Sequence, residues 1–363
     1  MIRQGAIALL GRADKPTDGV EEYCNHLGDA LRARGIGLAI ERVAWEERGW
    51  PRALRSLRRH ARAWKDSWVL VQYTALAWSG RGFPLRFWRV LHILKKVGAR
   101  ICVVYHDVEP FTGPRFIDRL RRSAQLRVMR HGMEACDVAV FTVPMEKLTW
   151  MQPHYTKAVF IPVGANLLVA GEAASRKSAA YDGKLGIAVF SVTGGKYLQR
   201  EVGEIADAMI FAASRVKNLR LTVFGRHAKD AEGELRKRLD SVPVEIQVLG
   251  LLSNEDVVRT MSNCDVLLFV RGPISTRRSS AIAGIACGLP VIAAEGPETS
   301  SIIKDAGVAF YSPPRKGDLG EALLHVLEDQ HYRATLAQRS WIAQQRYFSW
   351  NVIAGRYTEF LEK

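Results

Sequence analysis

The chain has 363 residues, of which 48% are hydrophobic and 25% charged, and its formal net charge is +15. This length suits two domains of ordinary size, and no run of about 20 apolar residues is present to form a transmembrane helix. Five dispersed cysteines without metal-ligand spacing favour reduced thiols and a cytoplasmic protein. The apolar stretch near the N-terminus lacks a signal-peptide cleavage pattern. The positive charge indicates an anionic partner: nucleic acid, a membrane surface or a phosphorylated substrate.

Strand-like and helix-like segments alternate along the chain, which predicts doubly wound α/β domains. In the first half we expect strands at 5–10, 37–43, 67–72, 100–105, 138–142 and 158–161, and helices that include 21–34, 87–97 and 117–132. In the second half we expect strands at 186–191, 219–224, 244–249, 265–270, 290–293 and 308–311, and helices at about 200–214, 230–241, 254–262 and 277–287.

The composition divides the chain into four parts. We expect an N-terminal domain over 1–165, a linker rich in Gly, Ala and Ser over 166–184, and a C-terminal domain over 185–345. Residues 346–363 contain Phe-Ser-Trp followed by apolar residues at helical spacing, which predicts a terminal amphipathic helix.

Arginines are concentrated in two segments, 52–65 and 115–130, where they are interleaved with Leu, Ile, Trp or Val at helical spacing. Helices of this kind can lie on anionic lipid headgroups. An ordinary amphipathic helix with a basic outer face is the alternative. We do not expect nucleic-acid binding, because no known nucleic-acid module and no aromatic stacking platform accompanies the basic residues.

The stretch 265–293 reads as one structural unit. A buried strand is followed by the loop 271–276, a helix of small apolar residues from Arg277 and a second strand after Gly288. The loop supplies backbone N–H groups, a helix N-terminus and the cations Arg277 and Arg278, which together suit a diphosphate. The alternative is a plain strand–loop–helix with solvated arginines, although cations at a helix N-terminus usually need an anion.

The runs Asp-Val-Leu-Leu-Phe and Ala-Cys-Gly-Leu-Pro-Val-Ile-Ala in this stretch resemble the nucleotide-sugar-binding half of GT-B glycosyltransferases, close to the family-four group. The resemblance covers nearly the whole chain. It implies two Rossmann-like domains facing across a cleft, with the C-terminal helix crossing back to the N-terminal domain. It also implies a nucleoside-diphosphate-sugar donor, retention of the anomeric configuration, and no cofactor or metal.

The first half carries three candidate residues at strand ends. Asp18 and Gly19 open a helix where the family has a Gly-Gly-x-Glu loop near the donor diphosphate, so Gly19 is a candidate binding residue. A simple turn with an Asp N-cap is the alternative. His106 and Asp107 resemble the His-Asp of the family near donor sugar and acceptor, which makes them the catalytic candidates. A structural histidine that caps the strand end is the alternative.

In the second half, the resemblance implies an Arg and a Lys that reach the donor diphosphate. Lys196 and Arg200 are our candidates, although their spacing differs from that of the family, and a Gly turn with a solvated Lys is the alternative. Gly225 and Arg226 form a further turn after a strand. The resemblance places the nucleobase near Leu252.

The sequence departs from the family at its Glu-x7-Glu pair. Counted back from Ala-Cys-Gly, the two positions hold Ser275 and Ala283. In place of the glutamates, this stretch carries the hydroxyl and guanidinium groups of Ser275, Thr276, Arg277, Arg278 and Ser279. Glu298, in a Pro-Glu that the family shares, could reach the ribose or the sugar instead.

Three functions remain open from the sequence. The first is a cytoplasmic glycosyltransferase at the inner membrane surface, which moves a hexose to a saccharide or lipid-linked acceptor in polysaccharide biosynthesis. The second is a catalytically inactive GT-B scaffold, which the missing glutamates would explain. The third is an enzyme of the same fold with another reaction, such as a sugar-nucleotide 2-epimerase.

Overall fold

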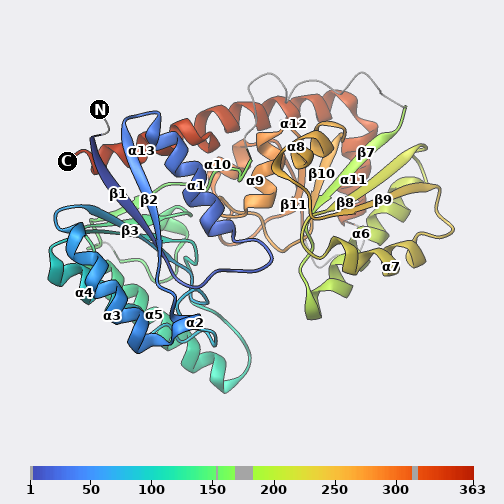
Figure 1. Ribbon diagram of the computed structural model, residues 1–363. Coiled ribbons are helices and arrows are strands. Elements are labelled where there is room, and N and C mark those ends of the chain that lie inside the picture. The colour runs from blue at the N-terminus through green and yellow to red at the C-terminus, as the bar shows by residue number, and fades with distance from the viewer. Residues whose placement is uncertain (1–2, 153, 168–182, 313–317) are drawn as a thin grey trace. The chain divides into compact units, whose positions relative to one another are not determined.

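The computed structural model describes residues 3–152, 154–167, 183–312 and 318–363. The chain forms two compact units, Met1–Pro162 with Trp350–Lys363, and Val163–Ser349. Each unit contains a six-stranded parallel sheet with helices packed on it (Figure 1). This confirms the expected α/β fold with two Rossmann-like domains. Most of the linker predicted over 166–184 lies outside the described residues.

The first sheet has the strand order β2-β1-β3-β4-β5-β6, so its direction of winding reverses between β1 and β3. Its strands are Arg3–Leu10 (β1), Ile36–Arg42 (β2), Trp68–Tyr73 (β3), Arg100–Tyr105 (β4), Val138–Phe141 (β5) and Ala158–Phe160 (β6). The helices of this unit are Gly19–Arg32 (α1), Trp45–Arg48 (α2), Trp50–His60 (α3), Phe87–Val97 (α4), Phe116–Ala135 (α5) and Trp350–Leu361 (α13).

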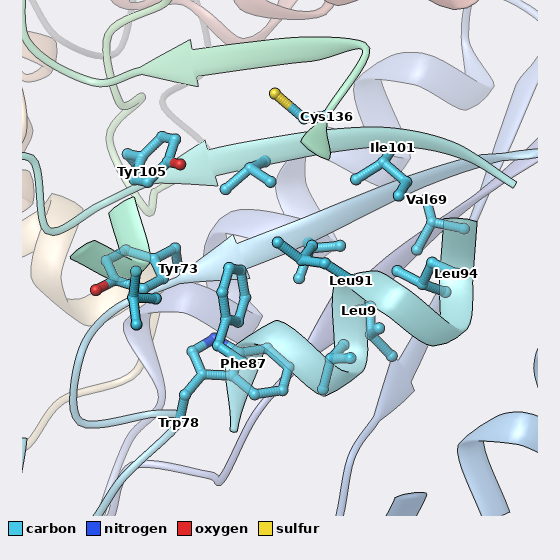
Figure 2. Packing of buried hydrophobic residues seen from close by; sticks show 14 of the residues in the cluster. Leu9, Val69, Tyr73, Trp78, Phe87, Leu91, Leu94, Ile101, Tyr105 and Cys136 are labelled. Atoms are coloured by element: carbon cyan, nitrogen blue, oxygen red, sulfur yellow. The ribbon is translucent and has the colours of Figure 1, made fainter. Parts of the chain in front are cut away.

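The core of the first unit forms where α4 packs on the sheet. Phe87, Leu91 and Leu94 recur at helical spacing and therefore share the face of α4 that meets the strands. In Figure 2 these side chains lie against Leu9 and Val69 of the sheet. Because β3 and β4 are covered on both faces, they read as continuous apolar runs, and this made them predictable.

The C-terminal helix belongs to the first unit. The buried hydroxyls of Tyr357 in α13 and Tyr23 in α1 lie 2.9 Å apart. Trp350, at the start of α13, packs edge-on against Tyr23 and stacks on His26. The expected return of the terminal helix to the N-terminal domain is thus confirmed.

The second sheet has the order β12-β11-β10-β7-β8-β9 and reverses between β7 and β10. Its strands are Leu185–Phe190 (β7), Leu219–Phe224 (β8), Val244–Gly250 (β9), Val266–Phe269 (β10), Val291–Ala294 (β11) and Val308–Tyr311 (β12). Its helices are Leu198–Ala213 (α6), Ala228–Arg238 (α7), Asn254–Ser262 (α8), Ser279–Ala286 (α9), Ser301–Asp305 (α10), Asp318–Glu328 (α11) and Gln330–Ala343 (α12).

One boundary near the expected anion site differs from the prediction. The helix expected to begin at Arg277 begins at Ser279, and Arg278 is its N-cap residue, without a side-chain capping bond. The loop is longer than expected because Arg277 turns to an ion pair outside the helix. In the described part of the chain, no helix is long and apolar enough to cross a membrane.

Candidate functional site

The winding of the second sheet reverses between β7 and β10, and ligands of open parallel sheets bind beyond the carboxyl ends of the strands at such a point. Two loops meet this condition, 191–197 after β7 and 270–278 after β10. The neighbouring loops after β8 and β11 flank them. Most candidate residues of the second half lie on these four loops.

The loops after β7 and β8 are joined through Ser191, whose backbone has a positive φ of 66°. The Ser191 hydroxyl accepts a hydrogen bond from the Arg226 amide at 3.1 Å. A Cβ at Gly225 would lie 2.4 Å from the Ser191 Oγ, and the φ of Gly225 is +89°. Gly225 is therefore required for this close approach, and the approach fixes where Arg226 leaves the sheet.

Charged side chains from three segments gather at this edge. Arg271 lies two residues beyond the end of β10, Glu201 lies on α6, and Arg226 lies two residues beyond the end of β8. Glu201 is buried and accepts a hydrogen bond from the Thr193 amide at 2.6 Å. Burial lowers the pKa of Arg271, the negative charge of Glu201 raises it, and the positive charge of Arg226 lowers it again. Two cations thus lie near one carboxylate.

The Nε of Arg271 is buried and has no hydrogen-bond partner among the described residues. An arginine remains charged at any physiological pH, and its desolvation is unfavourable unless an anion compensates it. We call Arg271, Arg226 and Glu201 the Arg271 cluster, and the buried, unpartnered Nε of Arg271 is the group in it that is able to take up an anion.

A second group forms between the loops after β10 and β11. Arg277 donates two hydrogen bonds to the Glu298 carboxylate, from Nε at 2.7 Å and from Nη2 at 2.8 Å. Ser275, which is buried, donates to the same carboxylate at 3.1 Å. The anion that Arg277 needs is thus Glu298, and the alternative of solvated arginines does not describe it.

The environment of Glu298 keeps its carboxylate ionised. Burial alone would raise the pKa of Glu298, but the hydrogen bonds and charge of Arg277 outweigh burial, so the pKa is lowered. The charge of Arg278 and the hydroxyl of Ser275 contribute to the lowering. Thr276 is fully buried beside them, and its carbonyl accepts a hydrogen bond from the Val163 amide at 3.1 Å.

The remaining candidates of the second half have surroundings of their own. Lys196 and Arg200 both rest on the exposed ring of Tyr197, with the charged ends 4.9 and 5.6 Å from the ring centre. Leu252 is half-buried in the loop after β9, and Ser279 is exposed in the first turn of α9.

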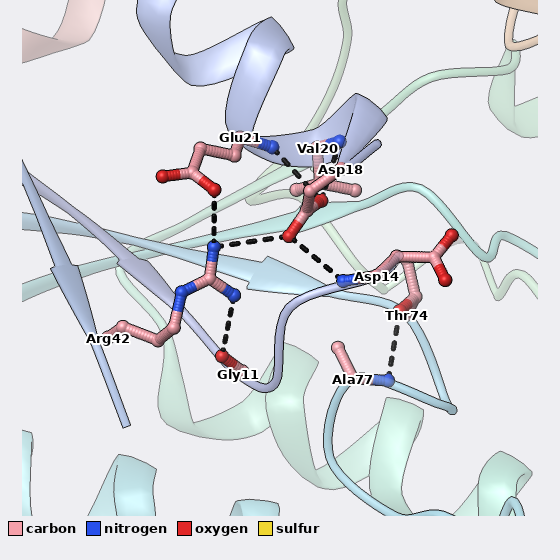
Figure 3. Close-up of polar contacts among 8 residues, drawn as sticks. All are labelled: Gly11, Asp14, Asp18, Val20, Glu21, Arg42, Thr74 and Ala77. Carbon is pink, nitrogen blue, oxygen red and sulfur yellow. Dashed lines mark hydrogen bonds and ion pairs between the residues drawn. The ribbon is translucent and has the colours of Figure 1, made fainter. Parts of the chain in front are cut away.

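In the first unit, Asp18 caps α1 by accepting hydrogen bonds from the amides of Val20 and Glu21 at 3.1 and 3.2 Å. Arg42, at the end of β2, donates to Asp18 at 3.1 Å and to Glu21 at 2.8 Å, as Figure 3 shows. Gly19 occupies the first position of the helix. The structure therefore has the turn with an Asp N-cap that the sequence left as the alternative.

His106 leaves the end of β4 and contacts Gln72 of β3, with its Nε2 2.8 Å from Gln72 Oε1. The Gln72 amide nitrogen donates to the Leu70 carbonyl at 3.1 Å, so its oxygen faces the imidazole and His106 Nε2 carries the proton. Tyr23 packs edge-on against the ring, with centroids 5.1 Å apart. Asp107 instead accepts a hydrogen bond from the Ala75 amide at 2.8 Å, which holds the loop after β3.

Sequence reasoning missed Arg271, Glu201, Arg42 and Gln72. Gln72 had a signal, because it is the one strongly polar residue in the fully buried strand β3. Arg271 also had a signal, since it follows a buried strand closely. Glu201 and Arg42 gave none, because their roles depend on residues brought together by the fold.

Residues 183–329 match the family model described as Glycosyl transferases group 1. No curated protein matches the chain. Sucrose-phosphate synthase from Thermosynechococcus elongatus is a similar solved structure, with a TM-score of 0.69, 15% identity, and coverage of 99% of this chain and 98% of the other.

Two further solved structures are also similar to the chain. The Anabaena protein HepE in complex with UDP and glucose has a TM-score of 0.65 and 13% identity, over 99% of this chain and 100% of the other. A putative UDP-N-acetylglucosamine 2-epimerase from Listeria monocytogenes has a TM-score of 0.63 and 11% identity, over 99% and 98%. At these identities the likeness concerns the fold.

Proposed function

We propose that the protein moves a hexose from a nucleoside-diphosphate sugar to a saccharide or lipid-linked saccharide in cell-surface polysaccharide biosynthesis, because residues 183–329 match the model of the group 1 glycosyltransferases. The observation that carries this proposal is the Arg271 cluster at the point where the second sheet reverses. The protein would act in the cytoplasm, at the inner surface of the membrane.

The donor diphosphate binds beside Arg271 and Arg226 in this proposal. The buried Nε of Arg271 has no hydrogen-bond partner among the described residues, and a diphosphate brings about two negative charges that an arginine can bind. Arg277 is less suited to this role than the sequence suggested, because Glu298 already balances its charge. Lys196 and Arg200 rest on Tyr197, and Arg200 also pairs with Glu204 at 3.5 Å, so in this proposal they are outer contacts of the diphosphate at most.

Glu298 takes over from the missing glutamate in this proposal. Ser275 stands at the first Glu position of the family, and its hydroxyl binds the Glu298 carboxylate at 3.1 Å. A carboxylate from the next loop is thus held beside the position that lost one. Arg277 fixes its direction, and the carboxylate accepts hydrogen bonds from hydroxyls of the ribose or the sugar.

Transfer needs no protein-bound metal in this account. The bond between the sugar C1 and the diphosphate oxygen breaks, and its electron pair stays on the diphosphate. A bond forms from C1 to an acceptor oxygen, whose proton passes to the departing diphosphate oxygen. Arg271 and Arg226 stabilise the negative charge that develops on the diphosphate. His106, held by Gln72, orients the sugar or the acceptor, and the configuration at C1 is retained.

The epimerase reading has a specific observation in its favour, the fold similarity to a putative 2-epimerase. An epimerase acts on the nucleotide sugar alone, whereas a transferase needs an acceptor. The scaffold reading predicts neither tight nucleotide binding nor turnover.

A first experiment separates these readings. Thermal stabilisation is measured with a panel of nucleoside diphosphates and their sugars, in the presence of a chelator, because a ligand of the native state raises its stability by mass action. The transferase reading predicts a shift with one base, and release of that diphosphate only when an acceptor is added. Conversion of the donor sugar without acceptor would support the epimerase, and no shift with any nucleotide would support the scaffold.

A further inference from the structure

The start of α5 keeps large apolar side chains in solvent. Phe116 is 73% exposed, and Ile117 and Leu120 on the next positions of the same turn are also exposed, as is Phe111 in the preceding loop. In the view of Figure 1 this end of α5 forms the lower tip of the first unit. Contiguous apolar groups at a protruding position mark an interaction site more often than chance exposure does.

The other basic segment found in the sequence behaves differently. In α3 the apolar residues Trp50, Leu54 and Leu57 are buried against the core, and after Pro51 the exposed positions are all basic. Helix α3 is therefore the ordinary amphipathic helix that the sequence left as the alternative. Helix α5 departs from that pattern in its first two turns, where large apolar side chains are exposed.

The surrounding surface is strongly basic. Helix α4 packs between α3 and α5, so the three helices form one layer on the first unit. They contain four, three and five Arg or Lys residues respectively, against the two acids Asp118 and Glu134. Asp118 is buried and paired with Arg121, so this pair adds no net charge and the remaining basic residues of the layer are opposed only by Glu134.

The exposed apolar tip is also held in place. Arg121 donates to the Arg81 carbonyl at 3.1 Å, and its guanidinium lies 5.1 Å from the ring centre of Phe111. The Gln125 side chain accepts a hydrogen bond from the Phe111 amide at 2.6 Å and donates to the Gly82 carbonyl at 2.9 Å. A preorganised surface loses little conformational freedom when it binds.

We propose that the α5 tip, defined as Phe111, Phe116, Ile117 and Leu120, docks into an anionic phospholipid bilayer, with the basic layer α3–α4–α5 facing the headgroups. Apolar side chains enter the acyl boundary while arginines beside them contact lipid phosphates, as in interfacial amphipathic helices. Nucleic acid offers no apolar phase for Ile117 and Leu120. The inference rests on the proposed function for its purpose, because docking to the bilayer would bring the enzyme to a lipid-linked acceptor.

Binding to vesicles tests this without any use of catalysis. The full chain is sedimented with vesicles of phosphatidylcholine and phosphatidylglycerol in equal parts, and with vesicles of phosphatidylcholine alone. The wild type should bind the mixed vesicles, and raised salt should weaken the binding. The double variant F116S/L120S should bind about tenfold or more weakly, because each side chain loses its apolar burial. I342S, at an exposed position of α12 in the second unit, is the matched control and should bind like the wild type.

A second variant tests the charge separately. R119Q/R122Q should weaken binding to the mixed vesicles, with about a fivefold loss per arginine, and K237Q on α7 should not. The four substituted positions of α5, which are 116, 119, 120 and 122, carry exposed or half-buried side chains. Thermal melting of the variants should therefore be unchanged, which checks that they fold. Equal binding of F116S/L120S and the wild type, or binding only to a protein or an oligonucleotide, would overturn the proposal. Nucleotide binding by a variant that no longer binds vesicles would show that the two functions are separate.

Discussion

Arg277 and Glu298 form a bidentate ion pair between two loops of the second unit, with N–O distances of 2.7 and 2.8 Å. Their side chains are 22% and 18% exposed, so the pair is screened only in part. The pair turns an arginine that the sequence assigned to phosphate into a group that orients a carboxylate. In our proposal the phosphate contacts therefore belong to Arg271 and Arg226.

Removal of Arg277 should destabilise the protein more than removal of a solvated arginine. In Arg277→Ala the Glu298 carboxylate loses both strong hydrogen bonds while still largely buried, and we expect a loss of about 1–3 kcal/mol in the free energy of unfolding. The double variant R277A/E298Q should lose less than the two single variants together, measured by urea denaturation. Strictly additive losses would show that the pair has no energetic coupling.

Stability should depend on pH through Glu298. Its pKa is lower in the folded protein than in the unfolded chain, so its contribution is complete above the unfolded value of about 4.3. The contribution is lost as the pH falls through the lowered pKa of the folded state. The difference in unfolding free energy between the wild type and Glu298→Gln should thus be constant from neutral pH to about 5 and decrease below about 4. A difference that grows on acidification would contradict this.

The Tyr23–Tyr357 contact should be measurable as a coupling between α1 and α13. Both hydroxyls are buried and lie 2.9 Å apart, so Tyr357→Phe leaves one of them unpaired and should cost about 1–2 kcal/mol. Tyr23→Phe should cost a similar amount, whereas the double variant removes both hydroxyls and should cost less than the sum. If the loss of unfolding free energy in the double variant equals the sum of the two single losses, the hydrogen bond does not stabilise the terminal helix.

Gln72 should control His106 without contacting substrate. In Gln72→Glu a carboxylate would face the imidazole 2.8 Å from its Nε2 and raise the pKa of His106. The acidic limb of the pH profile of kcat/KM should therefore move upward by about one pH unit or more. Gln72→Leu lacks that charge and should lower kcat without such a shift. An unchanged profile in Gln72→Glu would remove His106 from the reaction.

The sequence was sufficient to predict the strands, because the central strands of both sheets are buried on both faces and form continuous apolar runs. It also indicated that Arg277 needs an anion. The identity of that anion, 21 residues further along the chain, depends on the pairing of β10 with β11. The Arg271 cluster joins three separate segments, and no local pattern records such a meeting.

At the tip of α5 the sequence predicted the helix but not which of its apolar residues are exposed. Residues 115–130 have a helical pattern of apolar and basic residues, which predicts a helix and leaves open which apolar residues are buried. In the folded chain, where α4 packs against α5, Val128, Met129 and Met133 are buried and Phe116 remains in solvent.

Calorimetric titration of the preferred nucleoside diphosphate against Arg271→Gln tests the central claim most directly. We predict that Arg271→Gln binds at least about tenfold more weakly than the wild type, with stability unchanged or raised because a buried cation is removed. Lys237→Gln, which removes an exposed cation on α7, should bind like the wild type. Wild-type affinity in Arg271→Gln, together with loss of binding in Arg277→Gln, would contradict the account and return the diphosphate to Arg277.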